Sequence, residues 1–348
     1  MTMRLKQLFI FVLVTLAVAS CYNRSTPAGS EQTGTADSTQ VDSVLAELNR
    51  KILEDPANYI HYLNRAQYYG NKELYDQAFA DIQRALAADS TRDDVYLYKG
   101  ELHWFRQNVA GAYEEYKNCL KHNDKNTDCL LKKASIDIVL KNYDIAIKHI
   151  NDALRQNEYL PYAYYLKGRL YRATGDTTNA FSSYQTAIER DPKYYDAYVE
   201  VGLLMAQQKH DLALEYYNQA IALKPQSIEA MYNKAMFLQE TGFRDVTRYR
   251  NAFRIYDEIL KLDPNWAAAH FNKGFIYLEY MQQYDSASVE FTNAITLLPE
   301  YTSAWYNRGL SYESLGKDKQ AEADYRKALE LKPDYTEAAR ALSRVLKE

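Results

Sequence analysis

The stretch Thr302–Tyr335, TSAWYNRGLSYESLGKDKQAEADYRKALELKPDY, predicts two short amphipathic helices joined by a turn at Gly316. In its first half, Trp305, Gly309 and Tyr312 recur at steps of four and three residues. That spacing places them along one face of a helix. The second half shows the same spacing in Ala321, Tyr325 and Ala328.

The small residues of this stretch allow its two helices to pack closely. Gly309 and Ala321 have little side-chain volume where the helices would cross, so Tyr325 can cover the contact. Pro333 ends the second helix, because proline lacks a backbone N–H and clashes with the preceding turn. A pair of this size cannot bury its apolar faces alone, so it requires further copies of itself.

Such copies run through the chain and keep their register. The small residue of the first helix recurs mostly every 34 residues, as Ala66, Gly100, Ala134, Gly168, Gly202, Ala235, Gly274 and Gly309. The alanine of the second helix recurs in step, as Ala78, Ala112, Ala146, Ala180, Ala213, Ala252, Ala287 and Ala321. Proline closes the later copies, as Pro192, Pro225, Pro264, Pro299 and Pro333.

A repeat of about 34 residues with this order of positions resembles the tetratricopeptide repeat, TPR. The resemblance covers eight units over residues 59–334 and implies an all-α, right-handed α-solenoid of helix–turn–helix repeats. Residues 41–58 align with the second helix of a repeat and are predicted to be an N-terminal capping helix. Residues 335–348 are predicted to be the C-terminal capping helix.

The first 20 residues have the pattern of a secretory signal. Arg4 and Lys6 precede an apolar run at 8–18, which is too short to span a bilayer as a mature helix. The run ends VASC, which resembles a bacterial lipobox and implies a lipoprotein signal peptide over 1–20, cleaved before a lipidated Cys21. The alternative is an ordinary secretory signal with a chance cysteine at its boundary.

Residues 21–40 are rich in Ser, Thr and Gly and predict a disordered tether between the lipid and the folded part. Tyr22, rather than an aspartate, follows the cysteine. By resemblance to the enterobacterial sorting rule, this favours an outer-membrane anchor that faces the periplasm.

The charge and the motifs exclude several classes of function. Loss of the signal removes two of the 42 basic residues and none of the 46 acidic ones, which takes the formal net charge from −4 to −6. No concentrated basic stripe is present for nucleic acid. The six histidines are scattered, and the sequence has no HExxH, no zinc-spaced cysteine pair, no glycine-rich phosphate loop and no GxSxG. We therefore expect no enzyme, no metal and no cofactor.

The groove of a TPR stack is lined by the first helices, and the resemblance places several side chains there. These are Asn64, Tyr232, Asn233, Phe271, Asn272, Tyr306 and Asn307. A row of asparagine amides offers donors and acceptors to the backbone of an extended peptide, whatever its sequence. The alternative is that Tyr-Asn is only the ordinary TPR consensus here. The two-carboxylate clamp of chaperone-binding TPRs is not supported, because its Lys and Asn sites hold Leu63 and Gln67.

Trp104 and Phe105 are two adjacent large aromatics near the end of a first helix. Neighbouring helical residues point about 100° apart, so one is expected in the core and the other exposed as a binding hot spot.

One repeat is longer than the others. Ala235 and Gly274 are 39 residues apart, which leaves five extra residues within Gly242–Asn251, GFRDVTRYRN. The insert carries Arg244, Arg248 and Arg250, which one interpretation makes a site for an acidic or phosphorylated partner. The alternative is an extended helix with solvated arginines, since insertions at repeat tips are tolerated.

Two cysteines remain beside Cys21. Cys119 lies late in one repeat and Cys129 near the start of the next. A periplasmic disulfide is chemically allowed, but Cys119 also replaces a packing alanine, and a small buried thiol needs no partner. We expect the two thiols to be unpaired.

Together these features predict a lipid-anchored envelope scaffold that collects envelope proteins or extended peptides. This resembles TPR lipoproteins that recruit peptidoglycan enzymes or assist outer-membrane assembly and secretion. The alternative is a substrate-binding lipoprotein of a glycan uptake system, although those carry a large non-TPR module that has no room here. The sequence names neither the partner nor the oligomeric state.

Overall fold

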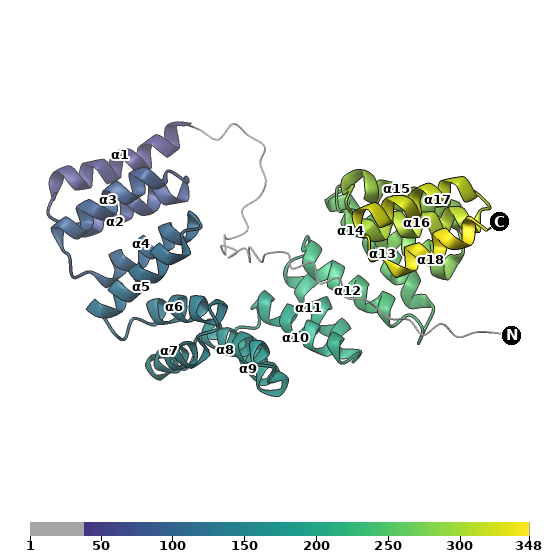
Figure 1. Ribbon diagram of the computed structural model, residues 1–348. Helices are drawn as coiled ribbons and strands as arrows, with labels where there is room; N and C mark the ends of the chain where they lie inside the picture. Colours follow the sequence, from purple (N-terminus) through teal and green to yellow (C-terminus); the bar gives the residue numbers. More distant parts are fainter. Residues whose placement is uncertain (1–37, 348) are drawn as a thin grey trace.

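The computed structural model describes residues 38–347, and every regular element in that range is a helix. The sixteen α-helices from α2 to α17 form eight consecutive hairpins, one for each predicted repeat. Figure 1 shows the hairpins following one another along a curved path, from α1 at one end to α18 at the other. The predicted all-α repeat solenoid is confirmed.

The helices are α1 (Ser38–Glu54), α2 (Tyr59–Asn71), α3 (Tyr75–Ala88), α4 (Asp93–Phe105), α5 (Val109–His122), α6 (Thr127–Val139), α7 (Tyr143–Gln156), α8 (Pro161–Ala173), α9 (Thr177–Arg190), α10 (Tyr195–Gln207), α11 (Leu212–Leu223), α12 (Ile228–Glu240), α13 (Thr247–Leu262), α14 (Ala267–Ile276), the π-helix η1 (Tyr277–Met281), α15 (Tyr284–Leu297), α16 (Thr302–Ser314), α17 (Asp318–Leu331) and α18 (Thr336–Val345).

The terminal helices lie close to their predicted positions. α1 contacts α2 and begins at Ser38, slightly before the predicted start of the N-terminal cap. α18 packs on α17 and contacts α16, within the predicted C-terminal cap. The predicted signal peptide, Cys21 and most of the predicted tether lie outside the described residues. Among the residues that are described, no helix combines the length and the apolarity that a bilayer crossing requires.

Close packing within each hairpin depends on the small residue of its first helix. A Cβ added to Gly309 would lie 2.6 Å from Cε1 of Tyr325, closer than real side chains approach. The same holds for Gly100 with Tyr116, Gly168 with Tyr184, Gly202 with Tyr217 and Gly274 with Phe291. Where the small residue is Ala134, the buried partner from the second helix is the smaller Ile150. The predicted role of the small residues is therefore confirmed.

Most hairpins turn on a residue in the left-handed region, seven positions after the small residue. These residues are Glu73, Gln107, Lys141, Gly175, Lys209 and Gly316, with φ between 53° and 83°. In the seventh repeat the equivalent residue, Gln282, comes eight positions after Gly274. The π-helix η1 absorbs the extra residue, because each π-turn takes in one residue more than an α-turn.

Candidate functional site: the first-helix face

We call the surface formed by α2, α4, α6, α8, α10, α12, α14 and α16 the first-helix face. Within this face, α2 contacts α4, α6 contacts α8 and α10 contacts α12. All the predicted groove residues lie on these helices. Their burial and partners decide which of them are available to a ligand.

The predicted groove aromatics take part in packing between repeats. The ring of Tyr306 lies 5.9 Å from that of Tyr325 in the second helix of its own repeat and 5.1 Å from that of Tyr335. Tyr335 directly precedes α18, so the three rings close the junction with the following helix. Three further repeats contain the same triad, namely Tyr165–Tyr184–Tyr194, Tyr232–Tyr256–Trp266 and Phe271–Phe291–Tyr301.

These triads account for part of the tyrosine content. They have aromatic residues at the same three places of the repeat, and this is the sequence signal that would have revealed them. Tyr232, Phe271 and Tyr306 are half-buried as a result, and each presents only part of its ring.

The predicted asparagine row is only partly available. Asn272 is 5% exposed and donates from its amide to the hydroxyl of Tyr232 at 3.0 Å. Asn307 is 7% exposed and donates to the carbonyl oxygen of Ser303 at 2.7 Å. Asn64 is exposed and Asn233 is half-buried. A row of four open amides is therefore not formed, because Asn272 bonds to the preceding repeat and Asn307 bonds within its own helix.

Trp104 and Phe105 differ from the expectation for adjacent helical residues. They are 39% and 37% exposed, so neither enters the core and both are accessible. The reason is their position in the last turn of α4, where the chain leaves the helix at the edge of the repeat.

Beneath the first-helix face, ion pairs join the two helices of several repeats. The guanidinium of Arg308 donates to both carboxylate oxygens of Asp324 at 2.8 Å. Arg65 and Asp81 form the equivalent pair in the first repeat, at 2.6 and 2.7 Å. Both basic residues directly precede the small residue, so this pattern was readable in the sequence. These pairs are intramolecular and buried, which suits them to structure rather than to chemistry.

Near the middle of the first-helix face, α10 carries a half-buried acidic residue, Glu200. Burial raises the pKa of Glu200, and the opposing charge of its ion-pair partner Arg172 only partly offsets this. Within the described part of the chain, no group of three or more His, Cys, Asp or Glu could hold a metal ion.

The arginine-bearing insert folds back on its own chain. The guanidinium of Arg248 donates to Asp211 at 2.8 Å and to the hydroxyl of Thr241 at 2.8 Å. Arg244 donates to the carbonyl oxygen of Lys209 at 2.9 Å. Half of the insert extends α13, as the second interpretation expected, but these two arginines are engaged rather than solvated. Arg250 is exposed.

The expectation of unpaired thiols is wrong. Cys119 of α5 and Cys129 of α6 are joined by a disulfide, with their Cα atoms 6.4 Å apart. Cys119 lies in the last turn of α5 and Cys129 in the first turn of α6, so the short connection brings the two sulfurs together. Both residues are fully buried, so they pack as predicted and are also bonded.

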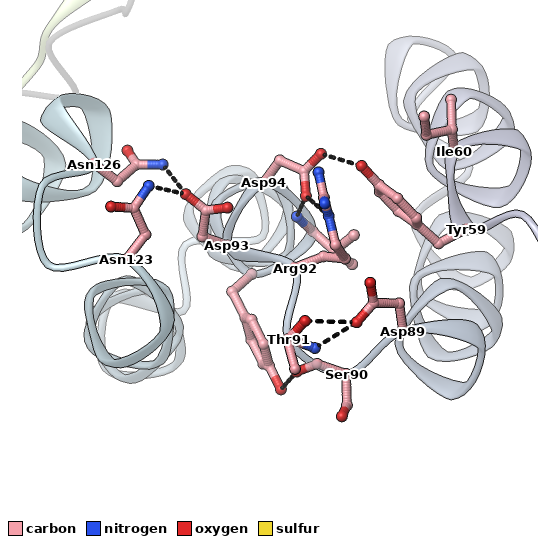
Figure 2. A network of polar contacts seen from close by, with 12 residues as sticks. Tyr59, Ile60, Asp89, Ser90, Thr91, Arg92, Asp93, Asp94, Asn123 and Asn126 are labelled. Carbon is pink, nitrogen blue, oxygen red and sulfur yellow. Dashed lines mark hydrogen bonds and ion pairs between the residues drawn. The ribbon is translucent and has the colours of Figure 1, made fainter.

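Polar side chains also fix the connections between repeats. In Figure 2, Tyr59 donates to Asp94 at 3.2 Å, and Asn123 and Asn126 donate to Asp93 at 2.7 and 2.8 Å. Burial alone would raise the pKa of Asp93, but these two amide donors lower it below its ordinary value. The network ties the first three repeats together at the edge opposite the hairpin turns.

Comparison with known proteins identifies the repeats. Residues 302–335 match one model of the tetratricopeptide repeat, and residues 161–194 and 201–227 match a second. The chain therefore contains tetratricopeptide repeats, and its fold is that of a TPR solenoid.

Relatives share this architecture at low identity. A TPR repeat-containing protein of Methanocaldococcus jannaschii is 24% identical over 294 residues, which are 81% of this chain and 45% of that protein. Human tetratricopeptide repeat protein 6 is 24% identical over 299 residues, which are 83% of this chain and 56% of that protein. The chain thus spans about half the length of these relatives. The crystal structure of the APC/C hetero-tetramer Cut9–Hcn1 has a TM-score of 0.54 at 17% identity, covering 82% of this chain and 55% of that one.

Proposed function

We propose that this protein is a non-enzymatic scaffold of the cell envelope, held to a membrane by lipid on Cys21, which binds envelope proteins or extended peptides on its first-helix face. The observation that carries the proposal is the succession of eight repeats, which sets eight first helices one after another along the solenoid. Such a surface suits contact with an elongated partner, because it offers many sites in a row.

Several further observations support the proposal. The disulfide Cys119–Cys129 suits an oxidising compartment such as the periplasm, which agrees with export by the signal at 1–20. Exposed Asn64 and half-buried Asn233 have amides on the face, at its beginning and in its later part. The proposed partners are a class, envelope proteins or extended peptides, because the described residues of the face do not select a particular sequence.

Photo-crosslinking in cells tests partner binding. A photoreactive residue replaces Asn64 or Asn233 on the first-helix face, and in the matched controls it replaces the exposed second-helix residues Gln83 or Glu258. We expect protein adducts from the two first-helix positions and far fewer from the controls. Equal labelling at all four positions, or retention of a glycan or metabolite without protein, would contradict a protein scaffold.

The anchor is tested separately. The mature N-terminal peptide should carry the mass of a diacylglycerol and a further acyl chain on Cys21, and Cys21→Ser should release the protein from membranes. An unmodified N-terminus that begins elsewhere would remove the anchor from the proposal and leave the scaffold intact.

A further inference from the structure

Exposed apolar side chains gather where the hairpins of repeats 2 and 3 turn. We call this set the apolar turn edge; it consists of Trp104, Phe105, Val109, Val139, Leu140 and Ile145. Val139 and Leu140 are 65% and 55% exposed. The residues come from the end of α4, the start of α5, the end of α6 with its C-cap, and the start of α7.

The two turns are neighbours in space. The hydroxyl of Tyr113 in α5 donates to Asp137 in α6 at 3.1 Å, which holds the start of α5 beside the end of α6. Val109 lies one helical turn before Tyr113, and Val139 lies two residues after Asp137. The two turns, and the apolar side chains they carry, therefore lie beside each other along one edge of the solenoid.

The fold does not require apolar residues at these turns. At the positions of Val139 and Leu140, the fourth repeat has Ala173 and Thr174 and the fifth has Gln207 and Gln208. All of these are polar or small, and their hairpins form in the same way. A group of exposed apolar side chains on a folded protein usually marks a contact surface. We therefore ask what contacts the apolar turn edge.

The position of the edge along the chain indicates that a membrane surface contacts it. α1 packs on the first repeat, and Ser38, where α1 begins, is 17 residues after Cys21. A chain of that length reaches at most about 60 Å when fully extended. The N-terminal repeats are thus the part of the solenoid that a lipid on Cys21 would keep nearest to the bilayer. Tryptophan, phenylalanine and branched aliphatic side chains are also those that enter the interface of a bilayer.

We propose that the apolar turn edge inserts into the lipid surface that holds the anchor, so that the N-terminal repeats lie against the membrane while the later repeats extend away from it. This rests on the proposed lipid on Cys21. Charges beside the edge have both signs, with Arg106 and Lys141 next to Asp76 and Asp144. Insertion should therefore depend on apolar contact and little on anionic lipid.

Vesicle flotation tests this without the anchor. The protein is the mature chain 21–348 with Cys21→Ser, which retains every described helix, mixed with vesicles of phosphatidylcholine alone or with phosphatidylglycerol. The edge variant combines Trp104→Ser, Val139→Ser and Leu140→Ser. The matched control combines Val289→Ser, Leu298→Ser and Leu346→Ser, which are exposed apolar residues outside the edge.

We expect the parent and the control to float with both kinds of vesicle, and the edge variant to bind roughly tenfold less. Brominated lipid should quench the fluorescence of Trp104 in the parent, and Trp104→Phe should remove most of that quenching, because Trp266 and Trp305 are half-buried. Melting curves followed by circular dichroism check that each variant is folded.

Other results would overturn the proposal. These are a parent that does not float, a control that loses as much binding as the edge variant, or binding that needs anionic lipid. A parent that dimerises without floating, with a monomeric edge variant, would assign the edge to a second copy of the chain. Absence of lipid on Cys21 in cells would remove the anchor alone, since the flotation assay does not use it.

Discussion

Gly309 and Tyr325 act as a single packing unit, and their sizes are matched. The ring of Tyr325 occupies the space that a Cβ on Gly309 would need. In the third repeat, the larger Ala134 is paired with the smaller Ile150. The sixth repeat differs, because it buries both an alanine, Ala235, and a large ring, Tyr256, at these two positions.

We predict that Gly309→Ala destabilises the last repeat by about 1–3 kcal/mol, because the new methyl group must displace the ring of Tyr325. Tyr325→Ile, which copies the third repeat, should relieve that clash. The double variant should then be at least about 1 kcal/mol more stable than the sum of the single effects. Urea unfolding followed by circular dichroism measures all three. Strict additivity would show that the two residues are not coupled.

At the scale of elements, the two irregular repeats contact each other. The insert of the sixth repeat brings Tyr249 into a stack with Tyr280 of the π-helix η1, with ring centroids 3.5 Å apart. Arg248 joins the same insert to Asp211 in the fifth repeat. The insert therefore connects repeats 5, 6 and 7.

Loss of the arginine contact should loosen this connection. Arg248→Ala should destabilise the region by about 1 kcal/mol, since Asp211 is well exposed and the pair is partly screened by water. Amide exchange over residues 241–246 should become faster. Arg250→Ala changes an exposed arginine of the same helix and should leave the exchange rates as they are. Equal effects of the two changes would mean that the contact with Asp211 does not hold the insert.

The repeat period predicted the helices well because it reflects a steric requirement. Positions such as Gly309 and Ala321 must be small in every copy, and this fixes where helices start and cross. The partners of individual side chains have no such repetition. The sequence could not show that Asn272 bonds to Tyr232, which is 40 residues away. Nor could it show that Cys119 and Cys129 are bonded, because that depends on the path of one connection.

At the scale of the whole molecule, each repeat touches mainly its neighbours, so stability should be local. The disulfide joins repeats 2 and 3 and should stabilise them by about 2–4 kcal/mol. Reduction should therefore speed amide exchange in α5 and α6 and leave α16 and α17 unchanged. Thiol labelling of the denatured mature chain gives a direct check. We expect no free thiol before reduction and two after it, whereas two before reduction would exclude the bond.

Buried tyrosines run along the whole solenoid and should couple its stability to alkaline pH. Burial raises the pKa of Tyr165, Tyr184, Tyr217, Tyr256 and Tyr325. It raises that of Tyr335 to about 12. In the unfolded chain these phenols ionise near pH 10. Above that pH the unfolded state loses protons that the folded state keeps, so the free energy of unfolding falls as pH rises. Stability is complete below about pH 10 and is lost above it.

Each such tyrosine lowers the free energy of unfolding by about 1.4 kcal/mol per pH unit, over the range between its pKa in the unfolded chain and its pKa in the folded chain. With several of them, the helices should unfold over a narrow pH range, and phenolate absorbance at about 295 nm should rise together with the loss of helicity. Tyr335→Phe removes one of these groups near the C-terminal cap. It should reduce the slope of the free energy of unfolding against pH by the equivalent of about one proton. Full ionisation of the tyrosines near pH 10 with helicity intact would show that their hydroxyls reach water. The aromatic triads would then not seal the junctions between repeats as their geometry indicates.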